Sequence, residues 1–286
     1  MNVILVAGSL HYDIMIAVSH QPEKGETVLG TKMAYKFGGK GGNQAISAAK
    51  NGEMVRFAGA VGHDDNGEFL INTLKASSVD TQYVSILENE NSGMSVAISD
   101  DSGDYSAVVV SNSNKLIPEE TFESDSLWVD VSMLILQNEI PPKINLKAAV
   151  EAKKRGIKVC MNAAPVTDKN CSVFDYVDLM VVNAVEARDL SGIPVESLDS
   201  AKQAAVELAS RFEKVVVTAG QYGVAYAEIG ACPGSLPSIP VKLVSTHGAG
   251  DCLMGALCSK INKNKDLRDA VAFANEVAAK HVAQSS

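Results

Sequence analysis

Short apolar runs alternate with helix-like stretches along most of the chain, and this alternation is the strongest constraint on the fold. Strands that alternate with helices favour a doubly wound, mostly parallel sheet flanked by helices, which is an α/β fold. Ligands of such sheets bind beyond the carboxyl ends of the strands. The predicted strands are residues 3–7, 55–60, 133–136, 158–162, 179–182 and 215–218. The candidate site residues at or shortly after a strand end are Asp13, Glu139, Asn162, Asn183 and Gly220.

Two segments break the alternation, residues 27–37 and residues 93–111. In the second, strand-like runs at 94–98 and 105–110 flank an Asp- and Gly-rich turn, which predicts a β-hairpin. We expect a small β-sheet lid formed by residues of about 11–37 and 91–114, added to a single domain that spans residues 1–286. The chain shows no internal repeat, low-complexity segment or flexible linker that would divide it.

Composition narrows the class of protein. The 286 residues are 46% hydrophobic and 21% charged, which is enough for one large α/β core. A net charge of −9 argues against nucleic acid as a partner. Five cysteines without a Cys-x-x-Cys spacing predict reduced thiols and no zinc site. The apolar run at the N-terminus has no basic segment before it and is too short to span a bilayer, so we expect a cytoplasmic protein without a membrane partner.

A glycine-rich segment near the C-terminus reads Ser245-Thr246-His247-Gly248-Ala249-Gly250-Asp251 and precedes a helix-like run. The unpaired N–H groups and the positive dipole end of a helix N-terminus favour an anion. A carboxylate beside such an anion site suggests phosphoryl transfer. The alternative is ordinary helix capping, because small residues followed by Asp are a common way to begin a helix.

A second glycine cluster reads Gly38-Gly39-Lys40-Gly41-Gly42-Asn43-Gln44-Ala45. Glycine allows a ligand to approach the backbone closely, and an Asn amide both donates to and accepts from hydroxyls, so this cluster fits a polyol better than a nucleotide. It is not a Walker A loop, because Lys40 is followed by Gly41 and not by Ser or Thr. The early Gly8 also lacks the spaced glycines of a dinucleotide fingerprint.

Taken together, the two clusters resemble the signature regions of the ribokinase-like sugar kinases, the PfkB family. The resemblance runs from about residue 3 to about residue 282. Further segments similar to family motifs are Gly8-Ser9-Leu10-His11-Tyr12-Asp13 at the first strand exit, Pro22-Glu23-Lys24-Gly25-Glu26-Thr27 before the lid, Gln137-Asn138-Glu139 at a strand end, the turn Asn162-Ala163-Ala164-Pro165, the Asn-x-x-Glu magnesium motif Asn183-Ala184-Val185-Glu186, and the nucleotide-holding strand and turn Thr218-Ala219-Gly220-Gln221-Tyr222-Gly223.

The resemblance implies an ATP-dependent kinase that transfers the γ-phosphoryl group to a hydroxyl of a monosaccharide, ribose or a related sugar. Asp251 would accept or orient the proton of the attacking hydroxyl. The N–H groups of Gly248, Ala249 and Gly250 would stabilise charge on the transferring group. Positioning and electrostatics supply most of the rate in such transfers.

The resemblance also assigns the remaining site residues. The sugar-binding set is His11, Asp13, Gly39, Lys40, Asn43 and Glu139. The nucleotide-binding set is Asn183, Thr218, Gly220, Gly223 and Asn275. Asn183 and Glu186 would hold Mg²⁺ through its water shell. Three of these residues have plain alternatives: Lys40 as a solvent-facing ammonium, Glu186 as a solvated helix carboxylate, and Asn275 as an exposed helix residue. Asn162 is expected to shape a turn, and His11 and His247 to make ordinary hydrogen bonds.

Partners and competing functions follow from the same resemblance. The lid implies a homodimer, and the alternative is a lid that closes only on its own site. A nucleoside kinase is a competing reading, although an aromatic content of 5% offers no obvious stacking platform for a base. A sugar phosphate would need an extra basic group, and no Arg lies in these motifs. A silent sugar-binding regulator is the remaining alternative, against which the presence of Asp251, Gly248, Gly250 and Glu186 argues.

Three departures from the family pattern bear on a monovalent cation and on the sugar. His11 stands where the family's ribose enzymes have Asn, which puts ribose itself in question. Ser245 replaces an Asp that helps to form a K⁺ site, and the chain ends at Ser286 without the glycine-containing segment that closes that site. We therefore expect weak or no activation by K⁺. Initial rates with K⁺ replaced by a large organic cation should be nearly equal, and a severalfold loss of rate would contradict this expectation.

Overall fold

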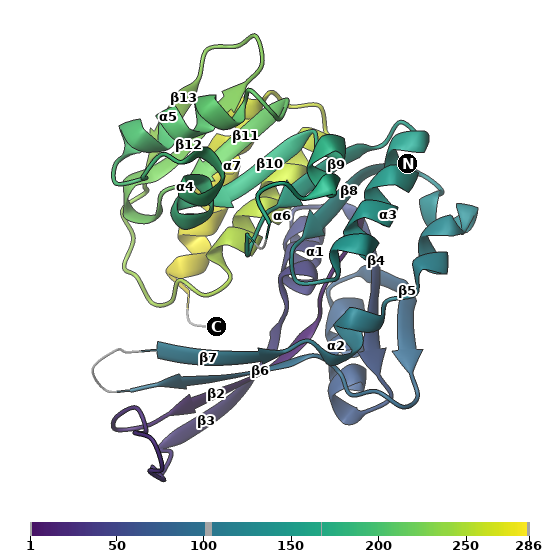
Figure 1. The fold of residues 1–286 in the computed structure, drawn as a ribbon, viewed down its shortest axis with the longest axis vertical. Coiled ribbons are helices and arrows are strands. Elements are labelled where there is room, and N and C mark those ends of the chain that lie inside the picture. Colours follow the sequence, from purple (N-terminus) through teal and green to yellow (C-terminus); the bar gives the residue numbers. More distant parts are fainter. Residues whose placement is uncertain (1, 101–104, 167, 285–286) are drawn as a thin grey trace.

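The computed structural model describes residues 2–100, 105–166 and 168–284, and a nine-stranded sheet forms its centre. Helices cover both faces of this sheet, and a separate four-stranded sheet projects from one side (Figure 1). The predicted doubly wound α/β fold is confirmed. None of the helices in the described part of the chain has the length and apolar character needed to cross a bilayer.

The large sheet is parallel over seven strands and antiparallel at one edge. Its order is β13-β12-β11-β10-β9-β8-β1-β4-β5, in which β12 and β13 pair antiparallel. The strands are β1 Val3–Ala7, β4 Met54–Gly62, β5 Val79–Leu87, β8 Val131–Gln137, β9 Lys158–Asn162, β10 Leu179–Asn183, β11 Lys214–Thr218, β12 Gly223–Glu228 and β13 Gly234–Pro237.

Two hydrophobic cores lie on the two faces of this sheet, because successive strand residues point to opposite sides. In β1, Leu5 belongs to the core beneath α3 and α5, whereas Ile4 and Val6 belong to the core beneath α1, α2, α6 and α7. The helices are α1 Lys40–Lys50, α2 Asp65–Ala76, α3 Pro142–Lys154, α4 Ala184–Ser191, α5 Leu198–Leu208, α6 Ala249–Asn262 and α7 Leu267–Val282. The 3₁₀ helices are η1 Asn112–Leu116, η2 Glu119–Glu123, η3 Asp125–Trp128, η4 Ser172–Tyr176 and η5 Gly220–Tyr222.

All six predicted strands are present, two of them with the predicted bounds, β1 and β9. The prediction did not include β5, β12 and β13, which lie at or near the sheet edges. The side chains of β5 and β13 are partly exposed, so their apolar runs are weaker than those of the central strands, whereas β12 is mostly buried.

The lid is the four-stranded sheet, in the order β3-β2-β6-β7. Its central pair β2·β6 is parallel, and the outer pairs β2·β3 and β6·β7 are antiparallel. The predicted hairpin is therefore confirmed as β6 and β7, although residues 101–104 of its turn lie outside the described residues. The lid strands are β2 His11–Ala17, β3 Lys32–Gly38, β6 Met94–Ser99 and β7 Tyr105–Val110.

Buried polar contacts attach the lid to the body at its base. Asn114 is fully buried, accepts a hydrogen bond from the N–H of Leu10 at 2.9 Å and donates to the Leu10 carbonyl at 2.8 Å. Asp64 caps α2 through the N–H of Gly67 and also accepts from the N–H and hydroxyl of Ser92, just before β6. One carboxylate thus joins a helix of the body to the entry of a lid strand.

Replacing Asp64 by Ala should destabilise the protein by about 1–2 kcal/mol at pH 7, the range for loss of an N-cap. Burial alone would raise the pKa of Asp64, but the hydrogen bonds from Ser92 and Gly67 outweigh it and place the pKa below its usual value. A lowered folded pKa contributes stability above the unfolded pKa that is lost as the pH falls through the folded pKa. Urea unfolding should therefore show a difference between wild type and variant that narrows below about pH 4.

The matched control is Asp65→Ala, which removes an exposed carboxylate from the same helix turn. It should change the unfolding free energy by a few tenths of a kcal/mol, about the size of a helix-dipole contact. Equal losses for the two variants, or a pH-independent loss for Asp64→Ala, would contradict the assignment.

Candidate active site

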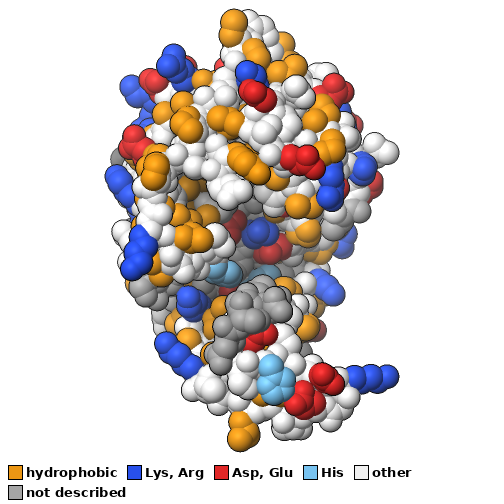
Figure 2. All heavy atoms as spheres, turned by 90° about the vertical axis from the view of Figure 1, so that its left-hand side faces the viewer, with side chains coloured by type: hydrophobic (Ala, Val, Ile, Leu, Met, Phe, Trp, Pro, Cys, Tyr) orange, Lys and Arg blue, Asp and Glu red, His pale blue; other side chains and the backbone are white. Residues whose placement is uncertain are grey.

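The carboxyl ends of the parallel strands meet the lid at a hollow. Glu139 follows β8, Asn162 ends β9 and Asn183 ends β10, so the register of the sheet brings these positions to one edge. Figure 2 shows acidic, basic and histidine side chains gathered in the hollow between the body above and the lid below. The predicted shared cleft is formed at this edge.

Two glycines bring the start of α1 against the end of β1. A Cβ atom on Gly41 would lie 2.7 Å from the Cα of Gly8, and a Cβ atom on Gly8 would lie 2.1 Å from Oε1 of Gln137. Gly41 lies inside the first turn of α1, so the second glycine cluster begins a helix. The N-terminus of α1 is consequently directed into the hollow.

Glu139 links three parts of the site through one carboxylate oxygen. Its Oε2 accepts from the hydroxyl of Ser9 at 2.6 Å and from the N–H of Lys40 at 2.9 Å, and it lies 3.9 Å from Nδ1 of His11. His11 is buried, and its Nε2 has no hydrogen-bond partner among the described residues. The expectation of ordinary hydrogen bonding for His11 is therefore not met at Nε2.

Asp13 lies in the lid strand β2 and is 4% exposed. Its Oδ1 accepts from the hydroxyl of Ser95 at 2.5 Å, and its Oδ2 lies 3.7 Å from Nε2 of His247. Burial raises the pKa of Asp13, although Ser95 and the two histidines His11 and His247 oppose the shift. The lid and the loop before α6 therefore meet at this carboxylate.

The sequence predicts an anion site at the N-terminus of α6. Gly248 caps the helix with φ of 72°, a left-handed conformation that favours glycine. The N–H of Ala249 donates to the carbonyl of Thr246 at 3.2 Å, so it already has a partner in the turn before the helix. The first N–H groups of a helix have no partner within it, which leaves Gly250 and the cap residue Gly248 as candidate donors.

Asp251 lies in the first turn of α6 and is 5% exposed. Its Oδ1 accepts from Nε2 of Gln44 at 2.9 Å. Burial raises the pKa of Asp251, and Lys40 and the amide donors of Gln44 and Asn43 oppose the shift. The carboxylate is thus held from α1 while it stands at the mouth of α6.

Lys40 is half-buried and not solvent-facing. Burial disfavours its charge, but the carboxylates of Asp251, Glu139 and Glu186 outweigh that effect and raise the pKa of Lys40. This one ammonium therefore carries a fixed positive charge in the field of three acidic side chains.

Asn183 and Glu186 form a capping box at the start of α4. The side chain of Asn183 accepts from the N–H of Glu186 at 3.0 Å, and Oε2 of Glu186 accepts from the N–H of Asn183 at 2.8 Å. Glu186 is 7% exposed, so the alternative of a solvated helix carboxylate is wrong. Burial raises the pKa of Glu186, and Asn183 and Lys40 oppose the shift.

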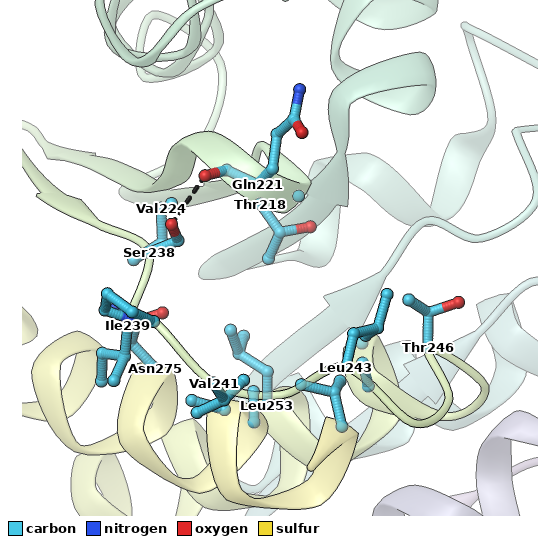
Figure 3. Close-up of a pocket in the computed structure, with 18 residues that line it drawn as sticks. Thr218, Gln221, Val224, Ser238, Ile239, Val241, Leu243, Thr246, Leu253 and Asn275 are labelled. Atoms are coloured by element: carbon cyan, nitrogen blue, oxygen red, sulfur yellow. Dashed lines mark hydrogen bonds between the residues drawn. The ribbon is translucent and has the colours of Figure 1, made fainter.

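The predicted nucleotide-binding residues, apart from Asn183, line one pocket of about 510 Å³. Thr218 and Gln221 lie on one side of it, and the apolar side chains of Val241, Leu243 and Leu253 lie on the other (Figure 3). Asn275 donates to the carbonyl of Pro237 at 3.1 Å and is not a freely exposed helix residue. The pocket is also lined by Gly220, Gly223, Ala249 and Gly250, so it extends to the N-terminus of α6.

Several residues in contact with the site were not predicted. Gln44 lies within the second glycine cluster and Ser9 within the first-strand motif, so both had a sequence signal. Ser95 had none, because only the pairing of β2 with β6 brings it beside Asp13. His281 of α7 contacts the carbonyl of His247 through Nε2 at 2.8 Å, a contact across 34 residues.

A family model described as "pfkB family carbohydrate kinase" matches residues 1–286. The chain belongs to the pfkB family of carbohydrate kinases. The ribokinase of Bacillus subtilis strain 168 is 33% identical to this kinase over 279 residues, which cover 97% of the chain and 92% of the relative. The ribokinase of Haemophilus influenzae is 30% identical over 293 residues, with 99% and 94% covered.

Solved structures agree with these relatives. A structure of Arabidopsis thaliana ribokinase complexed with ribose and ATP is similar with a TM-score of 0.90 and 28% identity, covering 99% of this kinase and 93% of that chain. A ribokinase of Cryptococcus neoformans in complex with ADP is similar with a TM-score of 0.87 and 25% identity, with 99% and 94% covered. The predicted ribokinase-like fold, the family and a phosphotransferase activity on an alcohol group are thereby confirmed.

Proposed function

We propose that this kinase transfers the γ-phosphoryl group of ATP to a hydroxyl of ribose or a closely related free monosaccharide. The observation that carries the proposal is the position of Asp251: a buried carboxylate at the N-terminus of α6, between the hydroxyl-binding residues and the nucleotide pocket. The similar proteins named as ribokinases, one of them complexed with ribose and ATP, support both substrates. A reaction that uses ATP agrees with the expected cytoplasmic location.

The acceptor sugar would lie between the lid and the start of α1. Asp13 and Glu139 supply carboxylate acceptors, Asn43 supplies an amide, and His11 supplies a ring nitrogen without a protein partner. Hydroxyls both donate and accept, so this mixed set suits a polyol. Gly39 caps α1 next to these groups and offers its backbone at close range.

The donor nucleotide would occupy the 510 Å³ pocket. Its apolar side, formed by α6, α7 and residues 239–243, suits a base, and Thr218, Gly220 and Gly223 at the opposite side suit a ribose and phosphates. The phosphate chain would then end at Gly248 and Gly250, where the helix dipole of α6 favours negative charge.

The chemistry follows from these positions. Asp251 would accept the proton of the sugar hydroxyl as that oxygen attacks the γ-phosphorus, while the bond from the γ-phosphorus to the bridging oxygen breaks and ADP leaves. The N–H groups of Gly248 and Gly250 and the ammonium of Lys40 would stabilise the charge on the phosphoryl oxygens. Because three carboxylates raise the pKa of Lys40, its ammonium is charged when the reaction begins.

The residues at α4 fit a magnesium ion that keeps its water shell. Both carboxylate oxygens of Glu186 accept hydrogen bonds from Asn183, at 2.8 and 2.9 Å, so a direct bond to a metal would compete with the capping box. Mg²⁺ retains several waters and is bound mainly by phosphates, and those waters would contact Glu186 and Asn183. When bound, the ion would neutralise charge on the phosphates.

Asp251→Asn should lower kcat by roughly 10²- to 10⁴-fold, the usual contribution of a general base. The assay measures ATP consumption with Mg²⁺ over a panel of pentoses, hexoses and nucleosides. For wild type, kcat should fall at acid pH, with a midpoint above the usual Asp value because burial raises the pKa of Asp251.

Asp269→Asn is the matched control, because Asp269 occupies the third position of α7 as Asp251 does of α6, but is exposed. It should leave kcat unchanged.

Turnover of nucleosides but of no sugar by the wild-type enzyme would redirect the proposal to a nucleoside kinase. Ligand binding without turnover of any acceptor would redirect it to a sugar-binding regulator.

We further propose that the lid, an appendage of one kinase domain spanning residues 1–286, joins two copies into a homodimer. The lid face opposite Asp13 carries an apolar row across all four strands, Tyr35, Ile14, Val96 and Val108. Tyr35 is 52% exposed and Val108 66% exposed. An apolar sheet face of this kind in a water-exposed position favours association with a second copy.

Val108→Glu should shift the protein from dimer to monomer, because it places a charge within the proposed interface. Sedimentation velocity over a range of concentrations measures the change. Ile229→Glu alters a residue of similar exposure, 63%, at a turn of the body and should leave the dimer intact. A wild-type protein that stays monomeric at all concentrations would overturn this proposal.

A further inference from the structure

Gln44 of α1 is a fully buried amide that contacts the site without any role assigned so far. Its Nε2 donates to Oδ1 of Asp251 at 2.9 Å and to Oδ1 of Asn162 at 3.2 Å. Asn162 in turn donates through Nδ2 to the carbonyl of Val181 at 3.1 Å. A chain of amide donors therefore runs from the carboxyl ends of β9 and β10 to the carboxylate at the start of α6.

The orientation of the Gln44 amide is determined by these contacts. Both hydrogens of Nε2 are used, and both acceptors are oxygens. If the amide were flipped, its own oxygen would face the oxygens of Asp251 and Asn162. Asn162 cannot turn to relieve that contact without losing its bond to Val181.

This orientation leaves Oε1 of Gln44 buried and without a partner among the described side chains. An unpaired buried polar atom is unfavourable, and such groups in native structures call for an explanation. A Met or Leu side chain would fill similar space without that cost. What Gln44 has and Met or Leu would lack is the hydrogen bond to Asp251, which offsets the cost of the unpaired Oε1.

We propose that Gln44 is a positioning residue for Asp251: it holds Oδ1, so that Oδ2 faces the acceptor hydroxyl, and it keeps the carboxylate in its ionised form. An amide can only donate to the carboxylate through Nε2 and cannot remove its proton. The inference rests on the proposed role of Asp251 as the group that accepts the hydroxyl proton.

The charges around Asp251 show why a neutral donor matters there. Lys40 of α1 favours the ionised carboxylate, whereas Glu139 after β8 and the burial of the site oppose it. Glu186 of α4 also lies in the same field. The donor from Gln44 lowers the pKa of Asp251, so its removal should raise that pKa further.

Gln44→Met tests this, because Met has a similar shape and no donor. We expect kcat to fall by roughly 10- to 100-fold, the size of a hydrogen bond to a charged group. The acid limb of the kcat–pH profile should move upward by about one pH unit, since the unbonded carboxylate is protonated more easily. KM for ATP should stay within about twofold, because Gln44 does not line the nucleotide pocket.

Gln44→Glu is the second variant, for use if Gln44→Met disturbs folding. A Glu side chain has the same shape as Gln. It places a carboxylate against Asp251, so the acid limb should again move upward. Asn262→Leu is the matched control: Asn262 is a buried amide on the same helix as Asp251, bonded to Ser132 and Glu53. This control should lose stability without any shift of the acid limb.

The outcomes separate this inference from the proposed function. If Asp251→Asn keeps its activity, the role of Asp251 fails and the inference fails with it. If Asp251→Asn is inactive but folded Gln44→Met and Gln44→Glu have wild-type kcat and an unchanged acid limb, only the positioning role of Gln44 is overturned. The positioning role would also be overturned if the control Asn262→Leu showed the same fall in kcat and the same shift of the acid limb as Gln44→Met.

Discussion

The close approach of Gly8 and Gly41 is the contact on which the site depends. Any side chain at either position would push α1 away from the end of β1, since a Cβ atom would come within 2.7 Å of the opposing backbone. With α1 in place, the N–H of Lys40 reaches Glu139, Gln44 reaches Asp251, and Gly255 of α6 packs against Ser47 of α1. One helix thus sets the positions of both the acceptor side and the phosphoryl side of the hollow.

Helix α1 also supplies the positive charge that balances a cluster of carboxylates. Asp13, Glu139, Asp251 and Glu186 are gathered near one edge of the sheet, and burial raises the pKa of three of them, Asp13, Asp251 and Glu186. Lys40 offsets this accumulation at the centre, and neutral donors from Ser9, Ser95, Gln44 and Asn183 hold the individual carboxylates. A phosphate chain entering at α6 adds negative charge, so a lysine that stays ionised beside the anion-binding N–H groups is a physical requirement of the proposed reaction.

The sequence predicted the large sheet and most of the site because the relevant signals are local. Buried parallel strands such as β1 are continuous apolar runs, and glycines at strand-to-helix turns mark close backbone approach. The edge strands β5 and β13 were not predicted, since half-exposed strands dilute the apolar signal, and the mostly buried β12 was not predicted either. Ser95 and His281 reach the site only through the pairing of β2 with β6 and the packing of α7, which no local pattern contains. The resemblance assigned the N–H of Ala249 to the transferring group, and only the structure shows that the turn at Thr246 already accepts a hydrogen bond from it.

The lid connects acceptor binding to the rest of the molecule. Its inner face carries Asp13, its outer face carries the exposed apolar row, and its base is attached through Asn114 and Asp64. Side chains of a strand alternate between its two faces. Asp13 therefore faces the proposed sugar site, whereas Ile14, the next residue, faces the proposed dimer interface. A shift of β2 along its neighbours by one residue would exchange these faces. The lid register, held at the base by polar contacts, therefore determines both the proposed acceptor site and the proposed association surface.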